Sequence, residues 1–261
     1  MPVTFPHALN CSIVLADLPL LDRPRAAADA GFDAVEFWWP FATAAPSDAE
    51  VDRFARAIED AGVRLIGLNI AAGDMPAGDR GLASWPGRAQ EFRDSVAVAV
   101  GLGERLGTRI FNALYGNRID GTVGQDEIAA ENLAHAAKEA GRIGATIVLE
   151  PLSGTDRYPL RTAAQAVEVL DRVGAPNLGL LADLYHLAAN GEDLDAVIAR
   201  YADRIAHVQL ADVPGRHEPG TGELDFAHLL DALRAAGYSG RTALEYVPTR
   251  PDFAWLGTEN R

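Results

Sequence analysis

Eight short apolar segments alternate with helical patterns along this 261-residue chain, and this alternation constrains the fold more than any other feature. The segments are rich in Ile, Leu and Val, which is typical of parallel strands buried on both faces. Eight β/α units in a chain near ~250 residues predict an α/β fold, a (β/α)8 TIM barrel, as a single domain over residues 1–261. We expect the strands at Ala8–Val14, Ala34–Trp38, Leu65–Ile70, Arg109–Leu114, Thr146–Glu150, Leu178–Asp183, Ile205–Leu210 and Thr242–Glu245.

The alternative is an open doubly wound sheet, which usually carries a Gly-rich G-x-G-x-x-G turn after its first strand. Here the first strand leads into LADLPLLDRP at residues 15–24, which lacks that turn. The missing turn favours the barrel and predicts that the protein uses no nucleotide cofactor.

Helix boundaries can be read from capping residues. Ser47 with Glu50, and Thr162 with Gln165, match the capping-box pattern at helix starts, and Gly62 is a stop signal. Further helices are expected at Arg23–Ala30, Ala89–Leu106, Asp126–Ile143, Leu194–Tyr201 and from Asp225 to Gly237. Few residues follow the last strand, so an eighth helix should be short or missing.

Four consecutive predicted strands end in an oxygen-bearing side chain: Glu150, Asp183, Gln209 and Glu245. Active sites of these barrels lie at the carboxyl ends of the strands, and neighbouring strands are ~4.8 Å apart. Any one acid could instead cap a helix or pair with a base, but four in succession suggest a shared role. Carboxylates and an amide oxygen suit Mg²⁺ or Mn²⁺, so we expect a divalent metal site.

Other candidates surround these strand ends. His186 lies three residues beyond Asp183, and Arg216 lies in the turn-rich segment VPGRHEPGTGE, where a rigid loop could aim it at an anion. Glu36 and Asn69 end the second and third strands and are expected at the pocket mouth. The long loop after the third strand, residues 71–87, should lie on the same face.

Composition excludes several classes of function. The chain has 23 Lys and Arg against 37 Asp and Glu, a net charge of −14, which argues against binding to a nucleic-acid backbone and against a nuclease. Its single Cys allows no internal disulfide or thiolate cluster. We see no signal peptide and no apolar run long enough for a membrane, so a cytoplasmic enzyme is expected.

The sequence resembles the hydroxypyruvate isomerase family, within the xylose isomerase-like barrels. The resemblance covers nearly the whole chain, and HVQLADVPGRHEPGTGELDF at residues 207–226 is its most specific segment. It is also seen in GFDAVEFWWP (31–40), NIAAGDMPAGDRG (69–81), PGRAQEFRDSVAVAV (86–100), IVLEP (147–151), ADLYHLAANGEDL (182–194) and ALEYVP (243–248).

The resemblance implies particular roles. A divalent metal would be held by Glu150, Asp183, Gln209 and Glu245, with Glu150 and Glu245 as the proton-transferring pair. His186, Arg216 and Asp156 would contact substrate, and Glu36 and Asn69 lie where they could join them. Related ketose epimerases usually have His at the Gln209 position, so Gln favours the isomerase branch.

The expected reaction interconverts hydroxypyruvate and tartronate semialdehyde. In the segment LSGTDRYPL, residues 152–160, Asp156 is kept but Ser153 stands where the family tends to have Asn. This departure leaves open a 2-oxo-tetronate isomerase or a ketose 3-epimerase, and a non-catalytic sugar-acid binding protein is a further alternative. The partner would be a small oxo-acid or sugar, and a homo-oligomer is possible because such barrels commonly pair.

Overall fold

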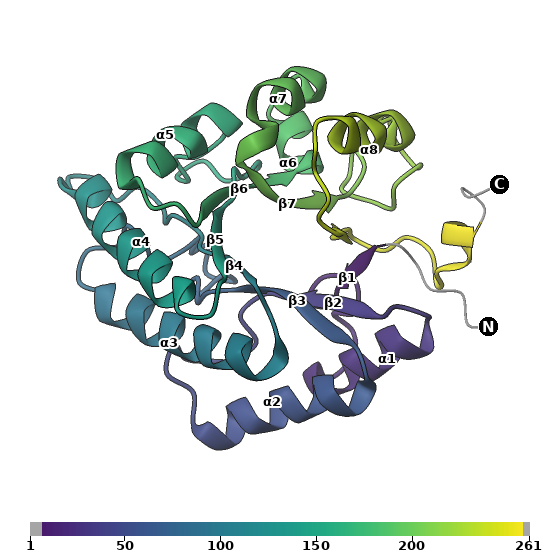
Figure 1. The fold of residues 1–261 in the computed structure, drawn as a ribbon, viewed down its shortest axis with the longest axis horizontal. Coiled ribbons are helices and arrows are strands. Elements are labelled where there is room, and N and C mark those ends of the chain that lie inside the picture. Colours follow the sequence, from purple (N-terminus) through teal and green to yellow (C-terminus); the bar gives the residue numbers. More distant parts are fainter. Residues whose placement is uncertain (1–6, 258–261) are drawn as a thin grey trace.

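The structure is a computed structural model that describes residues 7–257 of the chain. Its eight parallel strands form a closed barrel in the order β1 to β8, with helices around the outside (Figure 1). The predicted TIM barrel is therefore confirmed. The strands are β1 (Ala8–Asn10), β2 (Ala34–Phe37), β3 (Arg64–Asn69), β4 (Ile110–Asn112), β5 (Thr146–Leu149), β6 (Leu178–Asp183), β7 (Ile205–Leu210) and β8 (Thr242–Leu244).

The helices follow the capping signals. Ser47 and Thr162 form the two predicted capping boxes, and Gly62 ends its helix with a left-handed backbone at φ 71°. The main helices are α1 (Arg23–Asp29), α2 (Asp48–Ala61), α3 (Ala89–Leu106), α4 (Gln125–Gly141), α5 (Ala163–Val173), α6 (Leu184–Ala189), α7 (Leu194–Tyr201) and α8 (Phe226–Ala235). Within the described residues β8 is followed only by a short 3-10 helix, Ala254–Gly257, as expected.

Three elements differ most from the prediction. Strand β4 is Ile110–Asn112 rather than Arg109–Leu114. Strand β1 ends at Asn10 rather than Val14, because the Asn10 side-chain oxygen accepts the backbone N–H of Ser12 at 3.0 Å and the chain turns there. Helix α6 was not predicted, since it is only six residues long and follows β6 directly. Its start is held by the side chain of Asp183, which accepts the N–H groups of Tyr185 and His186.

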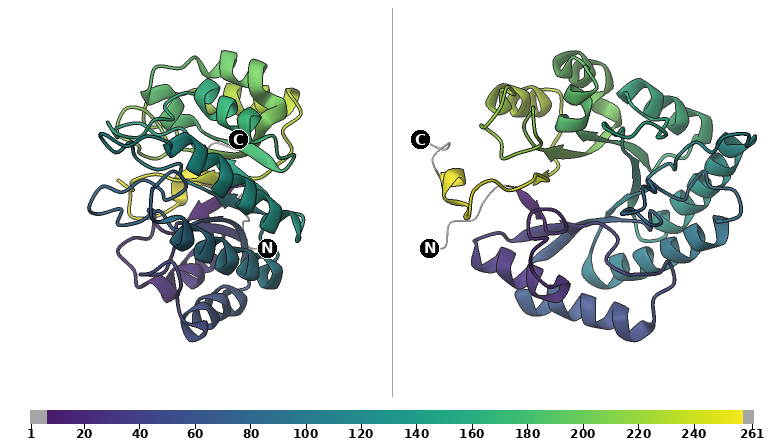
Figure 2. Two further views of the ribbon diagram at one scale, coloured as in Figure 1. Left: turned by 90° about the vertical axis from the view of Figure 1, so that its left-hand side faces the viewer. Right: turned by 180° about the vertical axis from the view of Figure 1, so that it is seen from behind.

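The last part of the described chain packs against the first, which closes the ring of helices. The C-terminal segment lies beside α1 and β1 in both views (Figures 1 and 2), and the rings of Phe253 and Phe32 meet edge to face at 5.0 Å between centroids. Strands β1 and β8 pair through Leu9 and Leu244. The strand ends that carry the candidate residues therefore belong to one continuous barrel rim.

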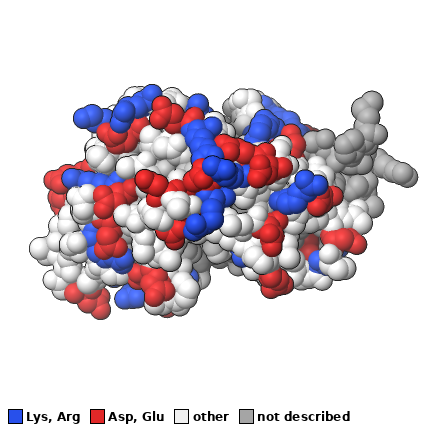
Figure 3. Space-filling model, turned by 90° about the horizontal axis from the view of Figure 1, so that it is seen from below, with Lys and Arg blue, Asp and Glu red and all other residues white. Residues whose placement is uncertain are grey.

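The outer surface mixes acidic and basic side chains. On the face shown in Figure 3, Lys and Arg lie among Asp and Glu rather than forming a uniform basic surface. Arg105 of α3, for example, pairs with Asp52 and Glu59 of α2. Within residues 7–257 no helix combines the length and the apolar character needed to cross a membrane.

Candidate active site

A cavity of about 180 Å³ lies at the carboxyl ends of the strands. Its ionisable lining residues come from the loops and strand ends after β3, β5, β6, β7 and β8: Arg80, Glu150, His186, Arg216 and Glu245. A larger cavity of about 860 Å³ adjoins it and shares Trp38 and Met75, but no strand-end acid lines that cavity. Because the strand-end acids Glu150 and Glu245 line the smaller cavity, we take it as the candidate site.

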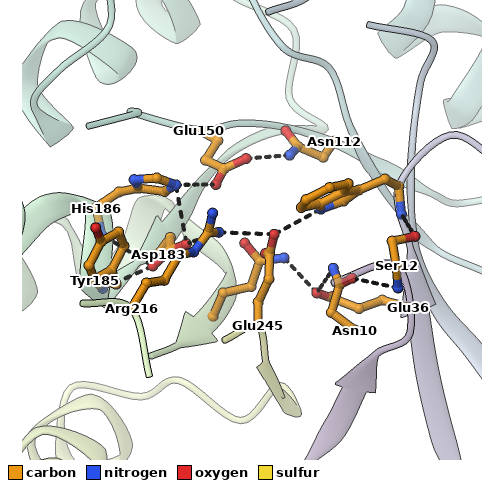
Figure 4. Close-up of polar contacts among 12 residues, drawn as sticks. Asn10, Ser12, Glu36, Asn112, Glu150, Asp183, Tyr185, His186, Arg216 and Glu245 are labelled. Carbon is orange, nitrogen blue, oxygen red and sulfur yellow. Dashed lines mark hydrogen bonds and ion pairs between the residues drawn. The ribbon is translucent and has the colours of Figure 1, made fainter. Parts of the chain in front are cut away.

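Asp183 and Glu245 are joined by Arg216 (Figure 4). The Arg216 Nη2 atom lies 3.4 Å from Asp183 Oδ2 and 3.1 Å from Glu245 Oε1. Glu245 Oε1 also accepts the indole N–H of Trp38 at 2.8 Å. These three interactions bring the ends of β6 and β8 to one point beneath the cavity.

The loop that carries Arg216 is organised by a buried carboxylate. Asp212 accepts the backbone N–H groups of Gly220, Gly222 and Leu224 at 2.8 to 3.1 Å, and Arg216 itself has a left-handed backbone at φ 61°. The guanidinium also lies over the ring of Tyr185 at 5.5 Å. The turn-rich segment thus fixes the direction of the Arg216 side chain.

Glu150 lies on the opposite wall of the cavity. Its Oε2 atom accepts the side-chain N–H of Asn112 at 2.6 Å, and its Oε1 atom lies 3.9 Å from His186 Nε2. One ligand atom each from Glu150, Asp183 and His186 lie within 4.8 Å of one another, so this buried group could hold a metal ion.

The proton on His186 can be placed from its partners. Its Nδ1 atom accepts the backbone N–H of Ser153 at 3.0 Å, so in the neutral ring the proton is on Nε2. Burial lowers the pKa of His186 to about 4, and the ring is therefore neutral near pH 7. Nε2 faces Glu150 and Asp183 at 3.9 and 3.7 Å, which is too long for a hydrogen bond. In this tautomer Nε2 carries a proton that it can donate, and His186 could bind a metal ion through Nε2 only in the other tautomer.

Crowding of buried acids shifts their pKa values. Burial raises the pKa of Glu150 well above its usual range, and the charges of Glu245 and Asp183 raise it further. Burial raises the pKa of Glu245 to about 8, although the Arg216 guanidinium opposes this shift. Two carboxyl groups that face one cavity with raised pKa values are suited to accept and return protons near neutral pH.

Gln209 lies next to Asp183 in the register of β6 and β7. Its amide nitrogen donates to Glu36 Oε1 at 2.5 Å, which leaves its oxygen directed elsewhere. That Gln209 Oε1 atom is buried and has no hydrogen-bond partner among the described residues, and the same is true of Glu245 Oε2. Buried oxygen atoms without donors are expected to have another partner, such as a cation.

The donor set therefore fits the divalent metal that the resemblance implies. Asp183 uses Oδ1 to cap α6, and its Oδ2 atom faces the cluster. The carboxylates of Glu150 and Asp183 lie within ligand distance of each other, and Glu245 is not part of that group. The open oxygens of Gln209 and Glu245 are further candidate ligands because they lack hydrogen-bond donors. Which of these residues bind the ion stays a prediction.

The remaining predicted residues lie in different places. Asn69 lines the cavity. Glu36 lies in the barrel interior and is not part of the cavity lining, because its oxygens accept from Asn10, His207 and Gln209. Asp156 is exposed and also lies outside the lining residues.

Sequence reasoning missed Asn112 and Arg80 as members of the site, and it noted Ser153 only as a departure from the family pattern. Ser153 and Arg80 lie in loops without hydrophobic periodicity, so no spacing rule marked them. Asn112 ends β4 next to Asn69 of β3, but the sequence predicted that this strand would run to Leu114, so Asn112 was not recognised as a strand-end residue. Trp38, which directly follows β2, also lines the cavity.

The fold and the acidic strand ends define the class of protein: a xylose isomerase-like TIM barrel, whose family model matches residues 24–258. The chain is 49% identical to the "Putative hydroxypyruvate isomerase" of Streptomyces coelicolor, over 95% of this chain and 94% of that one. It is 32% identical to the hydroxypyruvate isomerase of Escherichia coli, over 95% and 96%. The chain belongs to the hydroxypyruvate isomerase family and is an isomerase of that type.

Two further likenesses bear on substrate and fold. The chain is 36% identical to the 2-oxo-tetronate isomerase of Cupriavidus necator, over 96% of this chain and 95% of that one. A crystal structure titled AP endonuclease, family 2, from Brucella melitensis is similar with a TM-score of 0.86 and 34% identity, covering 98% of both chains.

Proposed function

We propose that this protein is a divalent-metal-dependent isomerase that interconverts hydroxypyruvate and 2-hydroxy-3-oxopropanoate, or tartronate semialdehyde. The observation that carries the proposal is the pair of buried carboxyl groups, Glu150 and Glu245, with raised pKa values at one small cavity. Similarity to hydroxypyruvate isomerases supports the choice of substrate.

The reaction moves one proton from C3 of hydroxypyruvate to C2 through an enediolate, while the C3 hydroxyl proton passes to the C2 oxygen. The barrier arises because a C–H bond beside a carbonyl is a weak acid. A divalent cation held by Glu150, Asp183, Gln209 and Glu245 would stabilise the negative charge that develops on the substrate oxygens.

The side chains supply proton transfer and positioning. One glutamate removes the C3 proton and the other returns a proton to C2, a role suited to their raised pKa values. His186 donates its Nε2–H to a substrate oxygen, since Ser153 holds the ring in the required tautomer. Arg216 keeps the carboxylates of Asp183 and Glu245 together at the floor of the cavity and contacts substrate from there.

The first test replaces one proton-transferring group. Glu245→Gln should lower the isomerisation of hydroxypyruvate by at least about 10²- to 10⁴-fold, the usual range for losing a general acid or base. Turnover and C–H exchange in D₂O are followed by NMR. Glu223→Gln, an exposed acid on the β7–α8 loop, is the matched control and should keep full activity. A Glu245→Gln variant with the wild-type rate contradicts the assignment.

The second test removes the metal. Dialysis against EDTA should abolish turnover, and Mg²⁺ or Mn²⁺ should restore it, with Mn²⁺ binding measured separately by calorimetry. Ligand binding that depends on metal in the absence of any C–H exchange would instead support a sugar-acid binding protein. Full turnover by the metal-free protein would refute the role of the ion.

A second candidate substrate is the four-carbon acid 2-oxo-tetronate. The similarity to 2-oxo-tetronate isomerase and the unusual Ser153 segment at the cavity wall favour it. A panel of hydroxypyruvate, 2-oxo-tetronate and free ketoses, with D₂O exchange as the common readout, separates these isomerases from a ketose 3-epimerase. The net charge of −14 argues against an endonuclease activity of the kind named for the Brucella melitensis protein.

A further inference from the structure

Arg80 is a second cation on the wall of the catalytic cavity. It lies in the loop between β3 and α3, and it lines the cavity together with Glu150, His186 and Arg216. Its Nη1 atom donates to the backbone oxygens of Met75 and Asp79 at 3.0 and 2.6 Å. Its Nε and Nη2 atoms make no hydrogen bond within the described part of the chain, so one edge of the guanidinium is open to a ligand.

The other arginines near the cavity are already paired with acids. Arg216 is shared between Asp183 and Glu245. Arg88, on the wall of the larger outer cavity, pairs with Asp79 and Glu91. Arg80 forms no ion pair with an acid in residues 7–257, which distinguishes it from both.

The charge of Arg80 therefore has no acidic partner in the described part of the chain. Its side chain is half-buried at the cavity wall. The other cavity arginine, Arg216, is already shared by Asp183 and Glu245. A carboxylate on the substrate would supply the anionic partner that Arg80 lacks.

Resting on the proposed function, we propose that Arg80 binds the carboxylate of the substrate and makes the site select oxo-acids over uncharged ketoses of the same length. The guanidinium edge formed by Nε and Nη2 matches the two oxygens of a carboxylate. Arg216, whose charge is shared by Asp183 and Glu245, contacts a different part of the substrate. Arg80 is thus a specificity-determining residue and takes no part in proton transfer.

The test compares two substrates that differ only at this group. Hydroxypyruvate carries a carboxylate where dihydroxyacetone carries a hydroxymethyl group, and both exchange a C–H proton in D₂O if the glutamates act on them. Arg80→Gln should lower kcat/KM for hydroxypyruvate by roughly 10- to 100-fold, mainly through KM, as expected for a lost charge-assisted bond. Exchange of dihydroxyacetone should change less than about twofold. An equal loss for both substrates, or no loss for hydroxypyruvate, overturns the proposal.

Two further variants separate binding from loop structure. Arg80→Lys should recover part of the affinity for hydroxypyruvate, because it restores the charge without the fork. Arg88→Gln, on the same loop but on the outer cavity, should leave the preference for the acid unchanged. Loss of the acid preference in Arg88→Gln would show that the loop conformation, not the Arg80 charge, sets specificity.

Direct binding distinguishes failure of this proposal from failure of the proposed function. Calorimetry of the Mn²⁺-loaded protein with glycerate, an unreactive acid, should show at least tenfold weaker binding to Arg80→Gln than to wild type. If Arg80→Gln weakens glycerate binding but the wild-type protein turns over neither substrate, only the proposed reaction is refuted. Hydroxypyruvate turnover with glycerate binding unaffected by Arg80→Gln, or no glycerate binding by the wild-type protein, would refute only the role of Arg80.

Discussion

At the scale of single residues, the site depends on a carboxylate that does not reach the cavity. Glu36 accepts hydrogen bonds from Asn10, His207 and Gln209 inside the barrel. Burial alone would raise the pKa of Glu36, but these donors lower it below its usual value, so the group is ionised. Because the Gln209 nitrogen is held by Glu36, its oxygen is left free for the cluster of strand-end acids.

Glu36→Gln should therefore weaken metal binding from a distance. An amide at position 36 can present its own N–H₂ to Gln209, so the Gln209 amide loses its fixed orientation. We expect Mn²⁺ affinity to fall about 10- to 100-fold, as for other residues that orient metal ligands. Calorimetric titration with Mn²⁺ measures the effect.

A matched control uses another fully buried carboxylate. Glu218 is held by Thr249 and the backbone of Arg250 and does not line the cavity. Glu218→Gln should cost folding stability but leave Mn²⁺ affinity within about twofold of wild type. Equal loss of affinity in both variants would show that stability, rather than orientation of Gln209, explains the Glu36 result.

Residue types at strand ends could be predicted from the sequence, but their partners could not. Glu150, Asp183, Gln209 and Glu245 follow from the periodicity of the strands, since the barrel brings successive strand ends together. The contacts of Glu36 with His207, or of Ser153 with His186, join residues 171 and 33 positions apart. Such contacts depend on side-chain direction within the closed barrel, which the strand pattern does not specify.

At the scale of elements, Asp183 serves both a helix and the cavity. Its Oδ1 atom caps α6, and its Oδ2 atom faces Arg216 and His186. The structural and the functional interpretations of this strand-end acid are therefore compatible. Sequence patterns predicted the capping boxes of α2 and α5 but missed α6, because its six residues are too few to show a helical stripe.

Two substitutions separate these uses of Asp183. Asp183→Asn keeps a side-chain oxygen for the α6 cap, whereas Asp183→Ala removes it. We expect the alanine variant to be about 1 kcal/mol less stable than the asparagine variant in urea unfolding without metal. Both should bind Mn²⁺ at least tenfold more weakly than wild type. If the two variants unfold at the same urea concentration, the cap contributes nothing to stability.

At the scale of the whole molecule, the barrel is closed by the pairing of β1 with β8, and a histidine lies at this seam. The Nδ1 atom of His7, just before β1, lies 2.6 Å from the hydroxyl of Thr242 in β8. Burial lowers the pKa of His7 to about 4, and the charges of Arg241 and Arg234 act in the same direction. Protonation of the His7 ring therefore destabilises the folded protein.

This shift makes stability depend on pH. In the unfolded chain the pKa of a histidine is about 6.5, so between pH 6.5 and about 4 the unfolded state binds more protons at His7 than the folded state. The contribution of His7 to stability is full above pH 6.5 and is lost as the pH falls toward 4. Allowing for the partial exposure of the ring, we expect a loss of about 2 kcal/mol over this window.

His7→Gln removes the titrating group and keeps a hydrogen-bonding side chain beside Thr242. We measure the free energy of unfolding in urea at pH 7.5 and at pH 4.5. Between these pH values it should fall by about 2 kcal/mol less for His7→Gln than for wild type. His186, whose pKa is lowered in the same way, is present in both proteins and cancels in the comparison. His228 provides a control of opposite sign, because Asp195 raises its pKa and His228→Gln should steepen the loss at low pH. If the free energy of unfolding falls equally with pH in wild type and in His7→Gln, then His7 at the β1–β8 pairing does not cause the loss of stability in acid.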